Sequence, residues 1–160
     1  MPCDPADPRP AAARGPHFVF RHSWTVPADP SATFAALADL AHYPRWWPQV
    51  RAVASISADD AHVLIRSAAP VTLELDMHRE VVDERSGVLA TVLDGDLVGW
   101  ARFTLHPDGP GRTRARYDQE VILAKAPLSH APAFLHPLMR LNHAWMMRSG
   151  ERGLARALRG

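Results

Sequence analysis

The chain has 160 residues, of which 47% are hydrophobic and 22% are charged, and its formal net charge is +1. This length indicates one globular domain, which would bury roughly two-thirds of its unfolded surface. The near balance of 18 basic and 17 acidic side chains argues against a nucleic-acid-binding protein, which needs a concentrated basic face. The single cysteine, Cys3, excludes an intrachain disulfide and a thiolate cage for a metal.

The first 16 residues are rich in proline and alanine and contain no apolar run. This composition predicts a disordered N-terminal tail over residues 1–16 and a single domain over residues 17–160. The tail lacks the roughly 7–15 apolar residues of a secretory signal. No segment approaches the ~20 apolar residues of a membrane span. We therefore expect a soluble, cytoplasmic protein.

The domain begins with a strand and a short helical region. Residues 17–26 alternate between apolar and polar side chains, which is typical of a half-buried strand. Asp29 is a suitable helix N-cap, and Pro30 suits the first helical position. The helix is predicted to run up to Pro44, because a proline disfavours helical geometry in the preceding residue. A second short helical turn then ends at Pro48.

Six further segments alternate in the same way and are separated by turn residues. They are predicted strands over residues 50–57, 62–67, 71–83, 88–94, 97–106 and 113–123. The gaps between them are too short for helical crossovers, so they are expected to form antiparallel hairpins. On one of these strands Leu73, Leu75, Met77 and Arg79 share a face.

A long helix is predicted from about Ser129 to Leu158, and Pro137 is expected to kink or reset its N-terminal turn. Gly150 and Gly153 suggest that the C-terminal half of this helix approaches the sheet closely. The elements together predict an α+β fold. A curved seven-stranded antiparallel sheet would wrap around a long C-terminal helix, with two short helices after the first strand and a cavity inside.

This order of elements resembles the helix-grip fold of the START-like (SRPBCC) superfamily. Within it, the sequence is similar to the polyketide cyclase/dehydrase and lipid-transport group over about residues 17–159. The matching segments are residues 26–30 (Val-Pro-Ala-Asp-Pro), 34–39 (Phe-Ala-Ala-Leu-Ala-Asp), 43–48 (Tyr-Pro-Arg-Trp-Trp-Pro), 102–118 and 142–154. The resemblance implies a cavity that binds a lipid, quinone, polyketide or hormone, and only some members of the group are enzymes.

Two candidate residues follow from the resemblance. In the aromatase/cyclases of the group, it implies an arginine that projects into the cavity from a middle strand and promotes aldol closure and dehydration. Arg79 stands at the matching place, and Tyr117 matches an aromatic residue of the last strand that lines the pocket. The serine expected two residues before the arginine is Met77, and the tyrosine expected after the Trp-Pro turn is Val50. The match therefore supports a cavity more than it supports cyclase chemistry.

The residues themselves lead to the same arginine and add a histidine. Arg79 is the one charge on an apolar strand face, where its planar fork could hold a carbonyl, enolate or carboxylate. The alternative is that it reaches solvent or a carboxylate such as Glu120. His22 shares a face with Phe20 and Trp24. It is either a general base or polar ligand contact, or a satisfied core histidine.

The remaining candidates are aromatic, leucine and methionine side chains that would line the cavity. They are Trp24, Trp46, Trp47, Leu73, Leu75, Met77, Phe103, Met139 and Met146. Each is open to the alternative of being ordinary core, and the paired tryptophans could form a gate or a plug. His136 and His143 lie two helical turns, roughly 10 Å, apart, so they do not chelate one ion. No metal or cofactor is expected.

Three functions remain open at this stage. The first is binding or transport of a small, mainly apolar molecule that is lipid-, polyketide- or quinone-like. The second is a polyketide aromatase/cyclase or dehydratase, in which Arg79 stabilises charge while His22 or Tyr117 assists proton transfer. The third is a protein-interaction role, for which an exposed apolar patch of several hundred Å² would be the sign. The expected partner is a small apolar molecule, and the protein is either a monomer or a homodimer.

Overall fold

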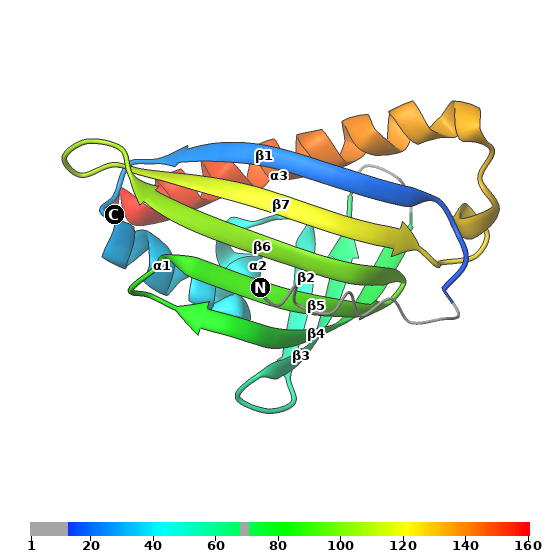
Figure 1. The fold of residues 1–160 in the computed structure, drawn as a ribbon, viewed down its shortest axis with the longest axis horizontal. Helices are drawn as coiled ribbons and strands as arrows, with labels where there is room; N and C mark the ends of the chain where they lie inside the picture. Colours follow the sequence, from blue (N-terminus) through cyan, green and yellow to red (C-terminus); the bar gives the residue numbers. More distant parts are fainter. Residues whose placement is uncertain (1–12, 68–70) are drawn as a thin grey trace, which may run out of the picture.

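Seven antiparallel strands form one sheet, and helices follow the first and the last strand (Figure 1). The computed structural model describes residues 13–67 and 71–160. The strands are β1 (His17–Val26), β2 (Val50–Ser55), β3 (Asp60–Arg66), β4 (Thr72–Asp83), β5 (Val88–Gly95), β6 (Leu97–Pro107) and β7 (Thr113–Leu123). The α-helices are α1 (Pro30–Ala38), α2 (Tyr43–Trp46) and α3 (His136–Leu158). Short 3-10 turns are η1 (Leu40–His42), η2 (Leu128–His130) and η3 (Ala133–Leu135).

The strand order is β1-β7-β6-β5-β4-β3-β2, so every neighbouring pair except β1–β7 is a hairpin. The sheet is curved, and the three α-helices lie on its concave side (Figure 1). The predicted fold class is therefore confirmed: a curved seven-stranded antiparallel sheet, a long C-terminal helix and short helices after the first strand. Of the predicted tail, residues 1–12 lie outside the described part of the chain.

The two short helices are divided differently from the prediction. The Asp29 carboxylate accepts a hydrogen bond from the Ala32 backbone N–H (2.9 Å) and caps α1 as expected. However, α1 ends at Ala38, so the prediction that it runs up to Pro44 was wrong. Pro44 lies in the first turn of α2, where a missing N–H breaks no intrahelical hydrogen bond.

The terminal helix is shorter at its start than predicted. It begins at His136 rather than near Ser129, and the preceding residues form the turns η2 and η3. Of the two predicted effects of Pro137, the structure shows the reset and not the kink: α3 begins at His136, and Pro137 lies in its first turn, where proline is tolerated. The predicted end at Leu158 is confirmed.

The two glycines of α3 face the α2 turn rather than the sheet. A Cβ on Gly150 would lie 2.5 Å from the indole ring of Trp47. A Cβ on Gly153 would lie 1.7 Å from the carbonyl oxygen of Trp46. The expectation that these glycines bring the helix onto the sheet was therefore wrong. They let α3 pack directly against α2, which lies beside the concave face.

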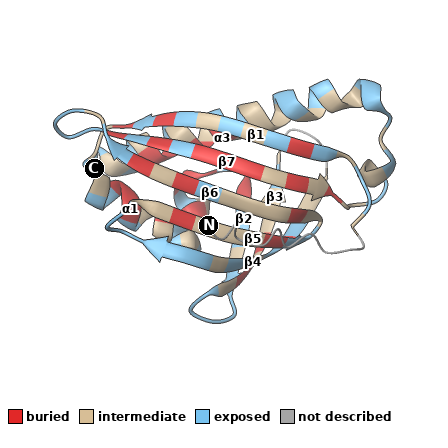
Figure 2. Cartoon of the chain, viewed as in Figure 1, coloured by how far each residue is buried: buried red, intermediate tan, exposed pale blue. Residues whose placement is uncertain are grey.

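Buried hydrophobic side chains form two clusters. Figure 2 shows how the buried positions are distributed along the strands and helices. The larger one surrounds Trp24, Met147 and Leu154, and the smaller one surrounds Phe18 and Val121. The side chains that pack against both clusters are Leu73, Met77, Leu97 and Ala101. Among the helices of the described residues, none is long and apolar enough to cross a membrane.

Candidate functional site

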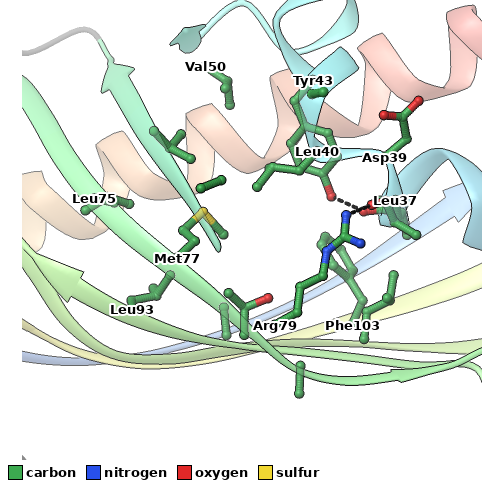
Figure 3. A pocket seen from close by; sticks show the side chains of 18 of the residues that line it. Leu37, Asp39, Leu40, Tyr43, Val50, Leu75, Met77, Arg79, Leu93 and Phe103 are labelled. Atoms are coloured by element: carbon green, nitrogen blue, oxygen red, sulfur yellow. Dashed lines mark hydrogen bonds between the residues drawn. The ribbon is translucent and has the colours of Figure 1, made fainter. Parts of the chain in front are cut away.

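A cavity of about 210 Å³ lies between the concave face of the sheet, the segment from α1 to α2, and α3 (Figure 3). A cavity that holds a single water molecule has a volume of roughly 10–15 Å³, so this much larger cavity has room for an organic molecule. Most of its lining is apolar, including Leu40, Val50, Leu75, Met77, Leu93 and Phe103. Polar side chains interrupt this lining at several places, and three of them, Asp39, Asp59 and Asp60, are acidic. A mainly apolar lining with a minority of polar groups is the usual character of a small-molecule site.

Arg79 provides the first of these polar places. It lies on the inward face of β4 with Leu75 and Met77, while the intervening side chains are exposed. Its Nη2 donates to the backbone carbonyl of Ala38, the last residue of α1 (Figure 3). Carbonyls at the end of a helix lack intrahelical partners and carry partial negative charge, so they suit a guanidinium.

The Arg79 side chain keeps further donors for another partner. Among the described residues it forms no salt bridge. A guanidinium has five N–H donors in a fixed fork, and the Ala38 carbonyl accepts from only one edge of it. Arg79 is therefore anchored by α1 and can still present charged donors to the cavity.

Tyr43 satisfies the neighbouring carbonyl of the same helix end. Its hydroxyl donates to the Leu37 carbonyl oxygen at 2.6 Å, and its ring lines the cavity (Figure 3). Burial raises the pKa of Tyr43, and the positive charge of Arg79 offsets only part of this effect. Tyr43 is thus neutral, and its hydroxyl is already bonded to the protein. This bond holds the end of α1, to which Arg79 is also bonded.

A chain of three polar side chains provides the second polar place. Nε2 of His143, on α3, lies 2.8 Å from Oε1 of Gln119, on β7. Nδ1 of the same ring lies 3.2 Å from Nε2 of His22, on β1, and the ring stacks on Phe20 at 3.6 Å. Because an amide oxygen only accepts, His143 donates through Nε2 and accepts through Nδ1 from His22.

This chain fixes the amide group of Gln119. Gln119 and His143 line the cavity, whereas His22 lies behind them, outside the lining. Within the described part of the chain, the Gln119 amide nitrogen has no protein partner, while its oxygen is occupied by His143. The amide NH₂ is therefore the group that Gln119 offers to a molecule in the cavity.

His22 and His143 are both neutral at neutral pH. Burial lowers the pKa of His143 to about 3, and the neighbouring His22 adds to this effect. Burial also lowers the pKa of His22. A group whose pKa is depressed in the folded state stabilises the protein above its ordinary pKa. That contribution is lost as the pH falls from about 6.5 towards the pKa of the folded state.

We therefore expect acid to destabilise the wild-type protein more than the variant His143→Gln. The difference should grow by up to about 1.4 kcal/mol for each pH unit below about 6.5. Urea unfolding curves of both proteins between neutral and mildly acid pH measure it. His62 and His78, whose carboxylate partners raise their pKa, contribute with the opposite sign and cancel in this comparison. Equal acid dependence of the two proteins would contradict a neutral His143.

Several of the residues selected from the sequence meet in this cavity. The lining includes Arg79, Tyr117, Trp47, Leu75, Met77, Phe103 and Met146. Tyr117 is buried beside Phe103, at 4.9 Å between ring centroids, and burial raises its pKa. It is therefore a neutral phenol at neutral pH.

The other selected residues lie outside the lining: His22, Trp24, Trp46, Leu73 and Met139. Trp24 is fully buried behind Trp47, and the two rings meet edge to face at 5.3 Å. The main chain of Trp46 packs against Gly153, and Met139 packs with the smaller cluster.

The selection from the sequence missed Tyr43, Gln119 and His143. A signal existed for Gln119, because it alternates onto the same face of the last strand as Tyr117. His143 lies four residues after Met139 and three before Met146, which is the spacing of one helix face. Across the described residues, no group of three histidine, cysteine or acidic side chains is placed to hold a metal ion.

The fold is shared with solved structures of very different sequence. A START superfamily protein from Mycobacterium smegmatis is 17% identical, with a TM-score of 0.71 over 88% of this chain and 95% of that chain. The Zhui aromatase/cyclase from Streptomyces sp. R1128 is 12% identical, with a TM-score of 0.74 over 88% and 92%. Norcoclaurine synthase from Thalictrum flavum is 12% identical, with a TM-score of 0.65 over 92% and 96%. At such low identity these likenesses show the fold alone.

One family profile matches the sequence. No curated protein sequence matches the chain. The profile of the family described as "polyketide cyclase / dehydrase and lipid transport" matches residues 17–159, almost all of the domain. The resemblance seen in the sequence is thereby confirmed. The chain belongs to the polyketide cyclase / dehydrase and lipid transport family.

Proposed function

We propose that residues 17–160 act as one domain that binds a small, mainly apolar molecule carrying oxygen atoms near both ends. Of the lipid-, polyketide- and quinone-like classes, the polar groups of the cavity favour the last two. The observation that supports this function most directly is the placement of Arg79 and Gln119 on either side of an apolar floor.

The strand register gives this placement. Arg79 pairs with Thr91, Thr91 with Ala101, and Ala101 with Gln119. The four residues thus form one row across β4, β5, β6 and β7, and all four line the cavity. Three strand spacings separate the backbones of Arg79 and Gln119 by roughly 14 Å. The small side chains of Thr91 and Ala101 leave room between them for a flat apolar molecule.

The two ends would recognise oxygen atoms of different charge. Arg79 offers charged donors, which suit an enolate, phenolate or carboxylate oxygen. The Gln119 amide offers neutral donors, which suit a carbonyl oxygen. Neutral His22 and His143 hold that amide in place without adding charge. A hydroxyquinone or an aromatic polyketide intermediate carries oxygens of both kinds on an apolar frame.

A cyclase or dehydratase activity is the second candidate. It is favoured by the part-buried His143 of α3, whose pKa is depressed and which is bonded to Gln119 at the opposite end of the row from Arg79, and by the likeness to the Zhui aromatase/cyclase. Both ring nitrogens of His143 are already engaged by the protein, and a pKa of about 3 makes it a weak base. His22 lies outside the lining. Binding without turnover is therefore the function that the geometry supports best.

The experiment that tests binding has two steps. Native mass spectrometry of freshly purified protein, followed by extraction, reveals any molecule carried from the host. Calorimetric titration then uses 2-hydroxy-1,4-naphthoquinone, a flat probe with an acidic enol and a carbonyl at separate positions. We expect one molecule bound per chain. Failure of every oxygen-bearing aromatic probe to bind would contradict the proposed function, and conversion of a polyketide probe would favour the enzyme.

We expect Ala101→Phe to abolish binding of this probe while the protein remains folded. The new ring would occupy the floor of the cavity between Arg79 and Gln119, where space for it already exists. Calorimetry measures the loss, which should be at least roughly tenfold, and thermal unfolding checks the fold. Ala54→Phe, on an exposed position of β2, is the matched control and should bind like the wild type. Unchanged binding by Ala101→Phe would place the probe outside the cavity.

A further inference from the structure

The outward face of α3 and of the turn before it is apolar over its first half. Phe134 is 78% exposed, Leu138 63%, Leu141 66% and Trp145 51%. These positions are three or four residues apart, so they form one stripe along the helix. Figure 1 shows this half of α3 running along the outer edge of β1, and Figure 2 shows its exposed positions.

The same stripe becomes basic over its second half. It continues, again at steps of three or four residues, through Arg148, Arg152, Arg156 and Arg159, all of them exposed. Within the described residues none of the four forms a salt bridge or a side-chain hydrogen bond. The one acidic residue of α3, Glu151, accepts a hydrogen bond from the Thr25 backbone N–H at 2.8 Å. Its carboxylate is therefore directed to β1 and away from the arginines.

Packing inside the protein does not account for the apolar half of the stripe. In this half of α3 two polar side chains face inward, while Arg140 is exposed. His143 binds Gln119 and His22, and Asn142 donates to Ser67 at 2.7 Å. Leucine and tryptophan face water instead. Contiguous exposed apolar side chains of this extent usually mark a surface that contacts another protein or a membrane.

The exposed area and the charge of the stripe together indicate whether it contacts a protein or a membrane. Four side chains exposed by half to four-fifths offer on the order of 500 Å², less than the ~800 Å² per partner of a stable protein dimer. On α3, a second copy of this chain would bring only Glu151 to meet the arginines, and that carboxylate is already bonded to the Thr25 backbone N–H. Aromatic and leucine side chains in line with arginines suit the boundary between acyl chains and anionic headgroups.

We propose that the outward face of α3 docks the protein on a lipid bilayer that contains anionic lipids. The helix lies parallel to the bilayer, with Leu138, Leu141 and Trp145 at the acyl boundary and the arginines at the headgroup phosphates. The opposite side of the same helix carries Met146 and His143, which line the cavity. Docking would therefore place the wall of the cavity beside the membrane, whichever ligand the cavity holds.

Co-sedimentation of the full-length protein with vesicles tests this docking. The vesicles contain phosphatidylcholine alone or phosphatidylcholine mixed with phosphatidylglycerol. We expect binding only with phosphatidylglycerol, and weaker binding as salt screens the charges. The pair Arg148→Ser and Arg152→Ser should lower the vesicle affinity roughly thirtyfold. The pair Leu141→Ser and Trp145→Ser removes the apolar anchors and should lower it at least as much.

Val82→Ser and Arg85→Ser together form the matched control, because both residues are exposed and lie near the end of β4, away from α3. This control should bind vesicles like the wild type. Three outcomes would overturn the inference. They are no preference for phosphatidylglycerol, equal binding by the α3 variants and the control, or a dimer that Leu141→Ser dissociates while vesicles are ignored. Calorimetric titration with the naphthoquinone probe is carried out without vesicles. Failure of membrane docking and failure of ligand binding are therefore distinguishable.

Discussion

Replacing Arg79 by methionine is expected to lower the affinity for 2-hydroxy-1,4-naphthoquinone by roughly ten- to a hundredfold. Hydrogen bonds to charged groups contribute about 1.5–3 kcal/mol, and about 1.4 kcal/mol corresponds to a factor of ten. Methionine keeps most of the apolar stem of Arg79 but removes the fork that α1 holds in place through the Ala38 carbonyl. Calorimetric titration of wild type and variant measures the difference.

Two comparisons separate recognition by Arg79 from a general change in the cavity. The unsubstituted 1,4-naphthoquinone lacks the acidic enol, so its affinity should fall much less in Arg79→Met than that of the hydroxylated probe. Arg85→Met, at an exposed position, should leave both affinities unchanged. Equal loss of both probes would show that Arg79 shapes the cavity without recognising charge. An unchanged affinity for the hydroxylated probe would exclude Arg79 from the site.

The fold was predictable because its determinants are local. Alternation of side chains gave the strands, and short gaps rich in Asp, Gly and Pro required hairpins. Only the pairing of β1 with β7 joins distant segments, and no local pattern in the sequence predicts it. The start of α3 was misplaced because the 3-10 turns η2 and η3 precede it without a break in composition.

The site was predictable only in part, because alternation gives the face of a side chain but not its depth. Arg79 was found since a single charge on an apolar face is visible in the sequence. Trp24 was assigned to the cavity, yet Trp47 stands in front of it. The link from His143 to Gln119 depends on how α3 is rotated against β7, which periodicity within either element does not determine.

The glycines of α3 show the same limit and lead to the largest expected change in stability. Gly153→Ala is expected to lower the free energy of unfolding by about 1–3 kcal/mol, the usual cost of overpacking. Helix propensity alone predicts the opposite, because alanine favours a helix over glycine by about 1 kcal/mol. Packing should prevail, since the new Cβ would lie 1.7 Å from the Trp46 carbonyl oxygen, and main chain has no alternative rotamer.

Relief of this clash must move α2 away from α3, and the next residue, Trp47, is a wall of the cavity. The Trp47 indole donates to the Met146 carbonyl at 3.0 Å and lies on Gly150, so this contact would loosen as well. Gly153→Ala should therefore weaken naphthoquinone binding along with stability. Ser149→Ala, on the same helix, is the control and should not destabilise the protein. Urea unfolding measures the change in stability, and calorimetry measures the change in binding. If Gly153→Ala were more stable than the wild type, α2 would move away from α3 at no cost and would not fix the position of Trp47.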